Sequence, residues 1–197
     1  AWANGYTGAG SKVAIIDTGT DLDHQSFDPA AFAYAIGQTG KDVDLLTAGD
    51  IEKVLEQLNI AKYGVDTDDL YVNAKVPFGY NYVDKDYDIT HDDDGQGEHG
   101  SHVAGIAAAN RYISDGNGGF VSALDTVSVQ GVAPDAQIIT MKVFGKSGGA
   151  YDSDYMVAIE DAIILGCDSV NLSLGSGSPG SSTNVTKRYQ EILDSLT

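Results

Sequence analysis

The stretch SKVAIID, residues 11–17, decides the fold of this chain. It is a short apolar run that ends at Asp17 and is followed by Thr-Gly, a pattern that predicts a buried strand with a carboxylate at its C-terminal end. IITMKVF (138–144) and DSVNLSL (168–174) predict two further strands of the same kind. Apolar residues recur at helical spacing between them, over 155–163, so this part predicts a strand, a helix and a strand. Such a unit is right-handed with parallel strands, and we therefore expect an α/β fold, a parallel sheet with helices on both faces.

Three more helices are expected outside this unit. SHVAGIAAANRY (101–112) consists largely of small residues, which predicts a helix that packs closely in the interior. VTKRYQEILDSLT (185–197) carries an apolar stripe at helical spacing, and TAGDIEKVLEQL (47–58) opens with a Thr-x-x-Asp capping signature.

The region from about residue 29 to 84 differs from the rest of the chain. Its last part, YVNAKVPFGYNYVD (71–84), is rich in tyrosine and predicts a strand or an extended segment. We interpret the region as an insertion at the edge of the sheet, within a single domain that covers residues 1–197. A Gly/Ser-rich stretch at 175–184 predicts a flexible loop near the C-terminus.

Composition limits the function classes. The chain has 197 residues, 42% of them hydrophobic, which suits one globular core. A formal net charge of −18 opposes binding to nucleic acid, whose phosphates attract Lys and Arg. We find no apolar run of the roughly 18 residues that a membrane span needs, and no signal peptide at the start. The single Cys167 cannot form an internal disulfide, which fits a cytosolic protein or a secreted one that does without disulfides.

Asp17 and His99 are the first candidates for chemistry. A carboxylate at the end of a buried parallel strand lies where open α/β sheets place functional groups, and it can orient an imidazole that serves as a general base. Each residue also has an ordinary interpretation: Asp-Thr-Gly is a common turn, and a histidine at a helix start is often a surface residue. Their spacing in the sequence does not show whether the two side chains meet.

Two other patterns suggest different chemistry. His91, His99 and His102, with the acidic residues 92–94, resemble a metal cluster, but they lack the spacing of known zinc motifs, and Val103 stands where a calcium loop needs a carboxylate. The acidic run is more simply a solvated loop.

The stretch GKSGG (145–149) matches the G-x-S-x-G signature of a hydrolase nucleophile. In that fold the helix starts at the serine and the histidine follows it in the chain. Here glycines delay the helix and all four histidines precede Ser147, so a turn or a substrate-facing segment is the better interpretation.

Taken together, four ordered motifs resemble a known family. VAIIDTG, HGSHVAG, GVAPDAQIITMKVFG and VNLSLGS occur in the order found in subtilisin-like serine proteases. The stretches YVNAKVPFGYNYVD and ITHDDDGQGEHG are similar to those of the cell-envelope proteinases of Gram-positive bacteria, the lactocepin and C5a-peptidase group.

The resemblance implies a site and a substrate. It makes Asp17 the aspartate and His99 the base of a Ser-His-Asp triad that hydrolyses peptide bonds in proteins or peptides. The segment 142–150 corresponds to the edge that pairs with an extended substrate, and the end of the third strand lines the pocket for the main substrate side chain. The substrate-binding residues implied are Phe144, Gly145, Gly148, Gly149, Ser173, Leu174 and Gly175.

The family also needs parts that these residues do not supply. Its nucleophilic serine and its oxyanion asparagine lie in the segment that would follow Thr197, so we expect a C-terminal remainder of the domain, on the same chain or another, to provide both. Without it we expect this chain to be inactive. No cofactor is implied; the family's calcium site places an aspartate where this chain has Ser26, so a structural calcium is not supported.

The resemblance implies a secreted or cell-wall-associated bacterial protein. The alternative function is a pseudoprotease or peptide-binding module whose groove holds peptide without cleaving it.

Overall fold

A four-stranded parallel sheet forms the centre of the computed structural model, which describes residues 1–92, 94–175 and 183–195. The strand order is β2-β5-β1-β6, with bounds Phe78–Asn81, Gln137–Lys142, Lys12–Asp17 and Ser169–Asn171. All neighbouring strands pair in parallel, and the register places Asp17 beside Lys142. The expected α/β fold with a parallel sheet is confirmed.

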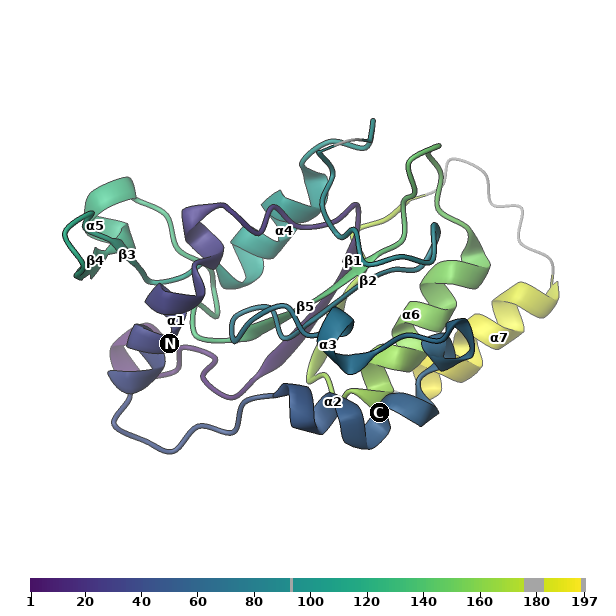
Figure 1. Cartoon of the computed structure of the whole chain (residues 1–197), viewed down its shortest axis with the longest axis horizontal. Helices are drawn as coiled ribbons and strands as arrows, with labels where there is room; N and C mark the ends of the chain where they lie inside the picture. The colour runs from purple at the N-terminus through teal and green to yellow at the C-terminus, as the bar shows by residue number, and fades with distance from the viewer. Residues whose placement is uncertain (93, 176–182, 196–197) are drawn as a thin grey trace.

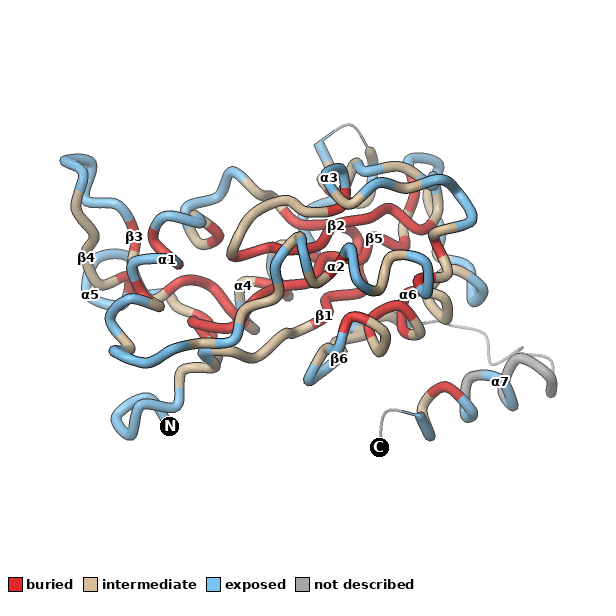
Figure 2. The backbone as a smooth tube through the Cα atoms, turned by 60° about the horizontal axis from the view of Figure 1, so that its bottom comes forward, coloured by how far each residue is buried: buried red, intermediate tan, exposed pale blue. Residues whose placement is uncertain are grey.

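Side chains alternate between the two faces along a strand, so these buried strands present apolar residues on both faces. Helices cover both faces of the sheet. On one face Ala14 and Ile16 of β1 pack in a core with α6 (Asp152–Ile164). On the other face Ile15 packs with α4 (His99–Ala108) through Ala104 and Ala108. Figure 1 shows α4 and α6 on opposite sides of the strands, and Figure 2 shows the burial concentrated along them.

The strand–helix–strand unit forms as expected, although its two strands are not neighbours. β1 lies between β5 and β6, so the connection through α6 crosses over it. The C-terminal α7 (Thr183–Asp194) packs against α6, buries Ile192, and pairs Arg188 with Glu160. Residues 176–182 of the expected loop at 175–184 lie outside the described residues, and its last two positions belong to α7.

The region from 29 to 84 supplies helices and the edge strand of the main sheet. The expected capping box is confirmed at the start of α2: Thr47 N donates to Asp50 at 3.1 Å, and hydrogen bonds from Lys53 and Thr47 lower the pKa of Asp50 to about 2. The segment expected to be strand or extended chain contains β2, which pairs with β5. The helices of this region are α1 (Pro29–Gly37), α2 (Ala48–Val54), α3 (Thr67–Leu70) and the 3-10 turns Leu55–Gln57 and Asn59–Tyr63. Another 3-10 turn, Gln25–Phe27, precedes the region.

One buried carboxylate ties this region to the sheet's helix layer. Asp161 of α6 accepts hydrogen bonds from Asn59 N at 2.7 Å and from the Tyr82 hydroxyl at 3.1 Å. Its burial raises its pKa, and burial likewise raises the pKa of Tyr82. Because Asn59 and Tyr82 come from two different segments of this region, the hydrogen bonds to Asp161 fix the region against α6.

The prediction of a helix over 101–112 was wrong at the C-terminal end of that range. α4 stops at Ala108, because Ala109 is extended and Asn110 N donates to Ser26 O at 2.9 Å instead of continuing the helix. The chain then forms a hairpin of β3 (Tyr112–Ser114) and β4 (Phe120–Ser122), followed by α5 (Ala123–Val127). A short 3-10 turn, Trp2–Asn4, opens the chain.

Candidate active site

Asp17 is a buried carboxylate at the C-terminal end of β1. Its side chain is 1% exposed, and Oδ1 accepts a hydrogen bond from Thr18 N at 2.7 Å. Oδ2 is also buried and has no hydrogen-bond partner among the described residues. The strand and the adjacent amide therefore fix the direction in which this carboxylate points.

His99 is the first residue of α4 and meets Asp17. Its Nδ1 lies 2.7 Å from Asp17 Oδ1, whereas its side chain is half exposed. An ionised carboxylate only accepts hydrogen bonds, so Nδ1 carries the proton and Nε2 of the neutral ring has a free lone pair. Among the described residues, the His99 imidazole has no other hydrogen-bond partner. The arrangement leaves Nε2 free to take a proton from a group in front of it.

Gly100 lets α4 approach the end of β1 closely enough for this contact. A Cβ at this position would lie 2.2 Å from Gly19 O and 3.2 Å from Asp17 Cβ. The contact is therefore possible only because the residue after His99 has no side chain. Gly105 on the same helix has open space at the corresponding point.

Thr18 joins the two segments through its hydroxyl group. The hydroxyl accepts a hydrogen bond from Gly100 N at 2.9 Å and donates one to Gly97 O at 3.2 Å. It thus caps the start of α4, where Glu98 makes no side-chain cap. We did not identify Thr18 or Gly100 as site residues from the sequence, although both lie within motifs that we singled out.

The two candidate substrate segments leave the sheet beside Asp17. β5 and β6 flank β1 and run parallel to it, so the residues that follow them emerge at the same edge. After β5, Gly145 is buried against Asp84, and Gly148 N donates to Gly145 O at 3.0 Å to form a turn. Phe144 is half-buried, whereas Gly149 is exposed.

The backbone conformation favours glycine at two positions of the first segment. Gly148 and Gly149 have φ of 85° and 83°, in the left-handed region that side chains disfavour. In the second segment Ser173 and Gly175 are exposed, and Leu174 packs against the core. Both segments present backbone to solvent, which is what addition of an extended peptide requires.

The G-x-S-x-G stretch does not have the geometry of a nucleophile elbow. Ser147 lies in an exposed turn, and α6 begins at Asp152 rather than at the serine. The stretch is therefore a turn, which is one of the two interpretations that we favoured from the sequence.

The histidines do not gather around one point. His99 turns to Asp17, whereas His24, His91 and His102 line a separate pocket of about 600 Å³. Within the described residues, no three metal-ligating side chains lie close enough to hold a metal ion. Ser26 uses its backbone N–H to donate to His24 Nδ1 at 3.2 Å.

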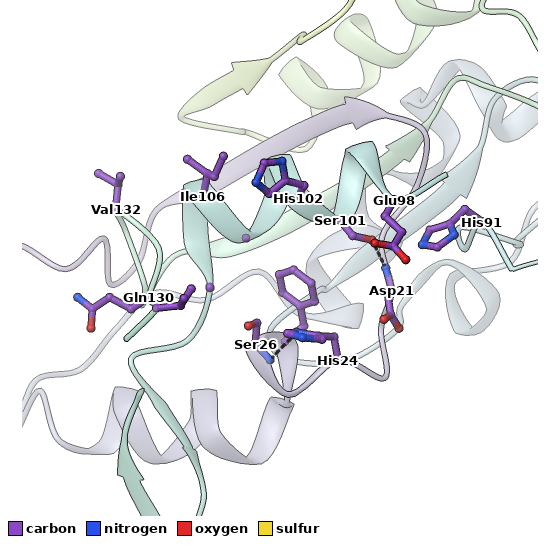
Figure 3. Close-up of a pocket in the computed structure, with 14 residues that line it drawn as sticks. Asp21, His24, Ser26, His91, Glu98, Ser101, His102, Ile106, Gln130 and Val132 are labelled. Carbon is purple, nitrogen blue, oxygen red and sulfur yellow. Dashed lines mark hydrogen bonds between the residues drawn. The ribbon is translucent and has the colours of Figure 1, made fainter. Parts of the chain in front are cut away.

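The pocket lies along α4, which contributes Ser101, His102 and Ile106 to its lining. Figure 3 shows Asp21, Glu98 and His91 at one end and Ile106 and Val132 toward the other. Asp21 N donates to Ser101 Oγ at 2.7 Å, which ties the chain after β1 to α4. Ile106 and Val132 are 57% and 69% exposed, so two large apolar side chains face solvent at this end of the pocket.

A parallel α/β sheet with a buried strand-end aspartate bonded to a histidine at a helix start is the arrangement of subtilisin-like proteins. The sequence profile of the Subtilase family matches residues 8–196, and the chain belongs to this family. The fold agrees with a cold adapted subtilisin-like serine proteinase of known crystal structure, with a TM-score of 0.53 and 21% identity over 97% of this chain and 45% of that one.

Within this family, the chain is similar in sequence to several bacterial proteinases. The PI-type proteinase of Lactococcus lactis subsp. cremoris is 40% identical over 181 residues, which are 90% of this chain and 8% of that protein. The minor extracellular protease Vpr of Bacillus subtilis is 33% identical, over 89% of this chain and 15% of that protein. A C5a peptidase of Streptococcus pyogenes is 31% identical, over 86% of this chain and 12% of that protein.

These relatives confirm the similarity to the cell-envelope proteinase and C5a-peptidase group, which the sequence motifs indicated. The chain spans only 8% to 15% of the length of these relatives. Among the described residues, no helix has the length and apolar character that crossing a membrane requires.

Proposed function

We propose that this chain is the aspartate- and histidine-bearing part of a serine endopeptidase. The observation that carries the proposal is the 2.7 Å contact between His99 Nδ1 and the buried Asp17 carboxylate, at the sheet edge where both candidate substrate segments emerge. Membership of the Subtilase family supports the same reaction class.

Asp17 and His99 have complementary roles in this reaction. His99 Nε2 accepts the proton of a serine hydroxyl as its oxygen attacks the peptide carbonyl, and then returns that proton to the leaving amine. Asp17 stays ionised: it keeps the Nδ1–H tautomer in place and stabilises the imidazolium that forms. Asp17 is almost completely buried, so water weakens this stabilisation less than it would at the surface.

The serine and the oxyanion-hole asparagine come from polypeptide outside these 197 residues. Two observations support this step. The matched subtilisin-like structure is about twice as long, since this chain covers 45% of it. In addition, Ile106 of α4 and the neighbouring Val132 are exposed apolar residues, of the kind that a domain core covers. The chain by itself is then inactive.

Proteins and peptides are the proposed substrates, bound in extended form. The turn at 144–149 and the segment 173–175 would each pair with the substrate backbone, with the Asp17–His99 pair between them. Relatives that include an extracellular protease support a secreted or cell-wall-associated location.

Labelling with a fluorophosphonate probe, which reacts only with an activated serine, tests the proposal. The complete protein should be labelled and should hydrolyse peptides, whereas Asp17→Asn and His99→Ala versions should lose most of both activities while they stay folded. A complete protein that binds peptide without cleavage or labelling would favour a peptide-binding module instead.

A further inference from the structure

A lysine ammonium group is buried beside the Asp17–His99 pair. Lys142 is the last residue of β5 and the register partner of Asp17, and its side chain is 1% exposed. Lysine is almost never fully buried unless it is paired, so its position requires an explanation. The proposed reaction uses no lysine.

Lys142 contacts both chain segments that carry the pair. Its Nζ donates to the carbonyl of Thr18, the residue after Asp17, at 2.7 Å. The same Nζ forms an ion pair with Asp94, whose side chain is also 1% exposed and which lies in the loop that leads into His99. One buried cation therefore bonds the turn after the aspartate to the loop before the histidine.

The two partners of Lys142 are themselves held in place. The other carboxylate oxygen of Asp94 accepts a hydrogen bond from Gln96 N at 2.9 Å, which shapes the loop. Thr18 N donates to Asp17 at 2.7 Å, and its hydroxyl group caps α4. A displacement of Lys142 or Asp94 would thus be transmitted to Asp17 on one side and to His99 on the other.

We propose that Lys142 and Asp94 form a positioning pair that sets the distance between Asp17 and His99. The proposal rests on the proposed function for its catalytic meaning, but the geometry that it concerns exists in this chain without serine or substrate. Neither residue touches the reacting atoms. A buried ion pair is weak evidence for stability, since apolar residues often serve as well, whereas it defines one geometry.

The double variant Lys142→Met/Asp94→Asn tests the positioning role. It removes both charges together, so no unpaired charge stays buried, and the side-chain oxygen of the new asparagine can still accept from Gln96 N. The first readout is the downfield proton NMR signal of His99 Nδ1–H in the complete protein, assigned with His99→Gln. We expect the signal to shift upfield or to exchange away in the double variant, although circular dichroism and thermal unfolding show a folded protein.

The second readout is turnover in the complete protein. A small misplacement of a catalytic group lowers kcat by about 100-fold. We expect such a loss in kcat with little change in KM, because the substrate segments stay in place. A loss of the NMR signal in a protein that never shows peptidase activity would support positioning while it refutes the proposed function.

A second buried ion pair provides the matched control. Arg111 Nε pairs with the fully buried Asp135 at 2.8 Å, in a part of the chain that contacts α1 through Ala35. Arg111→Met/Asp135→Asn should change stability and leave both readouts as in wild type. An unchanged His99 signal and kcat in the folded Lys142→Met/Asp94→Asn protein would overturn the proposal. If that variant does not fold, an unchanged signal in Asp94→Ala, which keeps β5 intact, would overturn it equally.

Discussion

The Asp17 carboxylate and the His99 imidazole lie 2.7 Å apart although they are 82 positions apart in the sequence. β1 fixes one partner and the start of α4 fixes the other, and only these two elements have to pack correctly for the pair to form. The proposed aspartate and histidine can therefore meet within this chain, without the proposed nucleophile. The contact also makes the consequences of individual substitutions predictable.

Replacement of His99 should abolish turnover, whereas replacement of His102 should not. His99→Ala removes the base and should lower kcat of the complete protein by about 10⁴-fold or more, because triad members act as a unit. His102 lies on the pocket side of α4 and is the matched control on the same helix. Steady-state kinetics with a peptide substrate measure both. A folded His102→Ala enzyme that lost more kcat than His99→Ala would show that the base is misassigned.

Alanine should have opposite effects at two glycines of α4. Gly→Ala in an exposed helix normally stabilises by up to about 1 kcal/mol, and Gly105 has space for the methyl group. At Gly100 the added Cβ would lie 2.2 Å from the Gly19 carbonyl oxygen, so α4 must move away from β1. Overpacking of this kind costs about 1–3 kcal/mol. Urea unfolding should therefore show Gly105→Ala at or above wild-type stability and Gly100→Ala clearly below it; equal stabilities would contradict the close packing.

The sequence predicted the elements of the site better than their contacts. The apolar runs of β1 and β5 and the capping box of α2 are local features of the sequence. They were sufficient to predict these strands and the start of this helix. The meeting of Asp17 and His99 depends on Gly100 and Thr18, whose roles exist only when β1 and α4 pack together. Spacing along the chain contains no such information, and for that reason the resemblance to a family was needed to choose between the interpretations.

The end of α4 and the buried lysines show the same limit. ANRY after Ala108 continues a helix-forming pattern, and the helix ends where hydrogen bonds to distant segments, such as those from Asn110 to Ser26 and from Gly131 to Ala109, replace helical ones. Lys75 and Lys142 are fully buried, whereas general rules place lysine at the surface. Their partners are carbonyls and a carboxylate from distant segments, so no local pattern could identify them.

The turn after β5 should discriminate long substrates from short ones. Gly149→Ala places a methyl group on the exposed backbone that we propose pairs with substrate, so KM for long peptides should rise by about tenfold while KM for small esters stays constant. Gly116→Ala is the control for backbone strain, because Gly116 has φ of 76°, close to the 83° of Gly149, and similarly open space. Equal increases for peptides and esters would show that this turn does not bind substrate.

The buried Lys75 should make stability rise with pH. Burial lowers its pKa from 10.5 to about 7, partly opposed by the charge of Asp135, and its Nζ donates to the carbonyls of Pro134 and Ala136 at 3.0 and 2.8 Å. Between pH 7 and 10.5 the unfolded chain therefore holds a proton on this lysine that the folded chain has released. Stability increases with pH wherever the unfolded state binds more protons, so the contribution of Lys75 is least favourable below pH 7 and improves steadily above it.

Lys75→Met isolates this contribution from the other groups that titrate in the same range. Methionine fills a similar volume beside the Phe32 ring, which lies 4.9 Å from the lysine Nζ, and it has no proton to lose. Urea unfolding at pH 6 and pH 9 should show wild type gaining stability relative to Lys75→Met as the pH rises. Leaving the two carbonyls without their donor lowers the stability of the variant at both values by a similar amount, so the difference between the two pH values is the quantity to compare. If wild type and variant changed in parallel between pH 6 and 9, Lys75 would hold its proton in the folded protein, and its contacts with the carbonyls and the Phe32 ring would outweigh the cost of its burial.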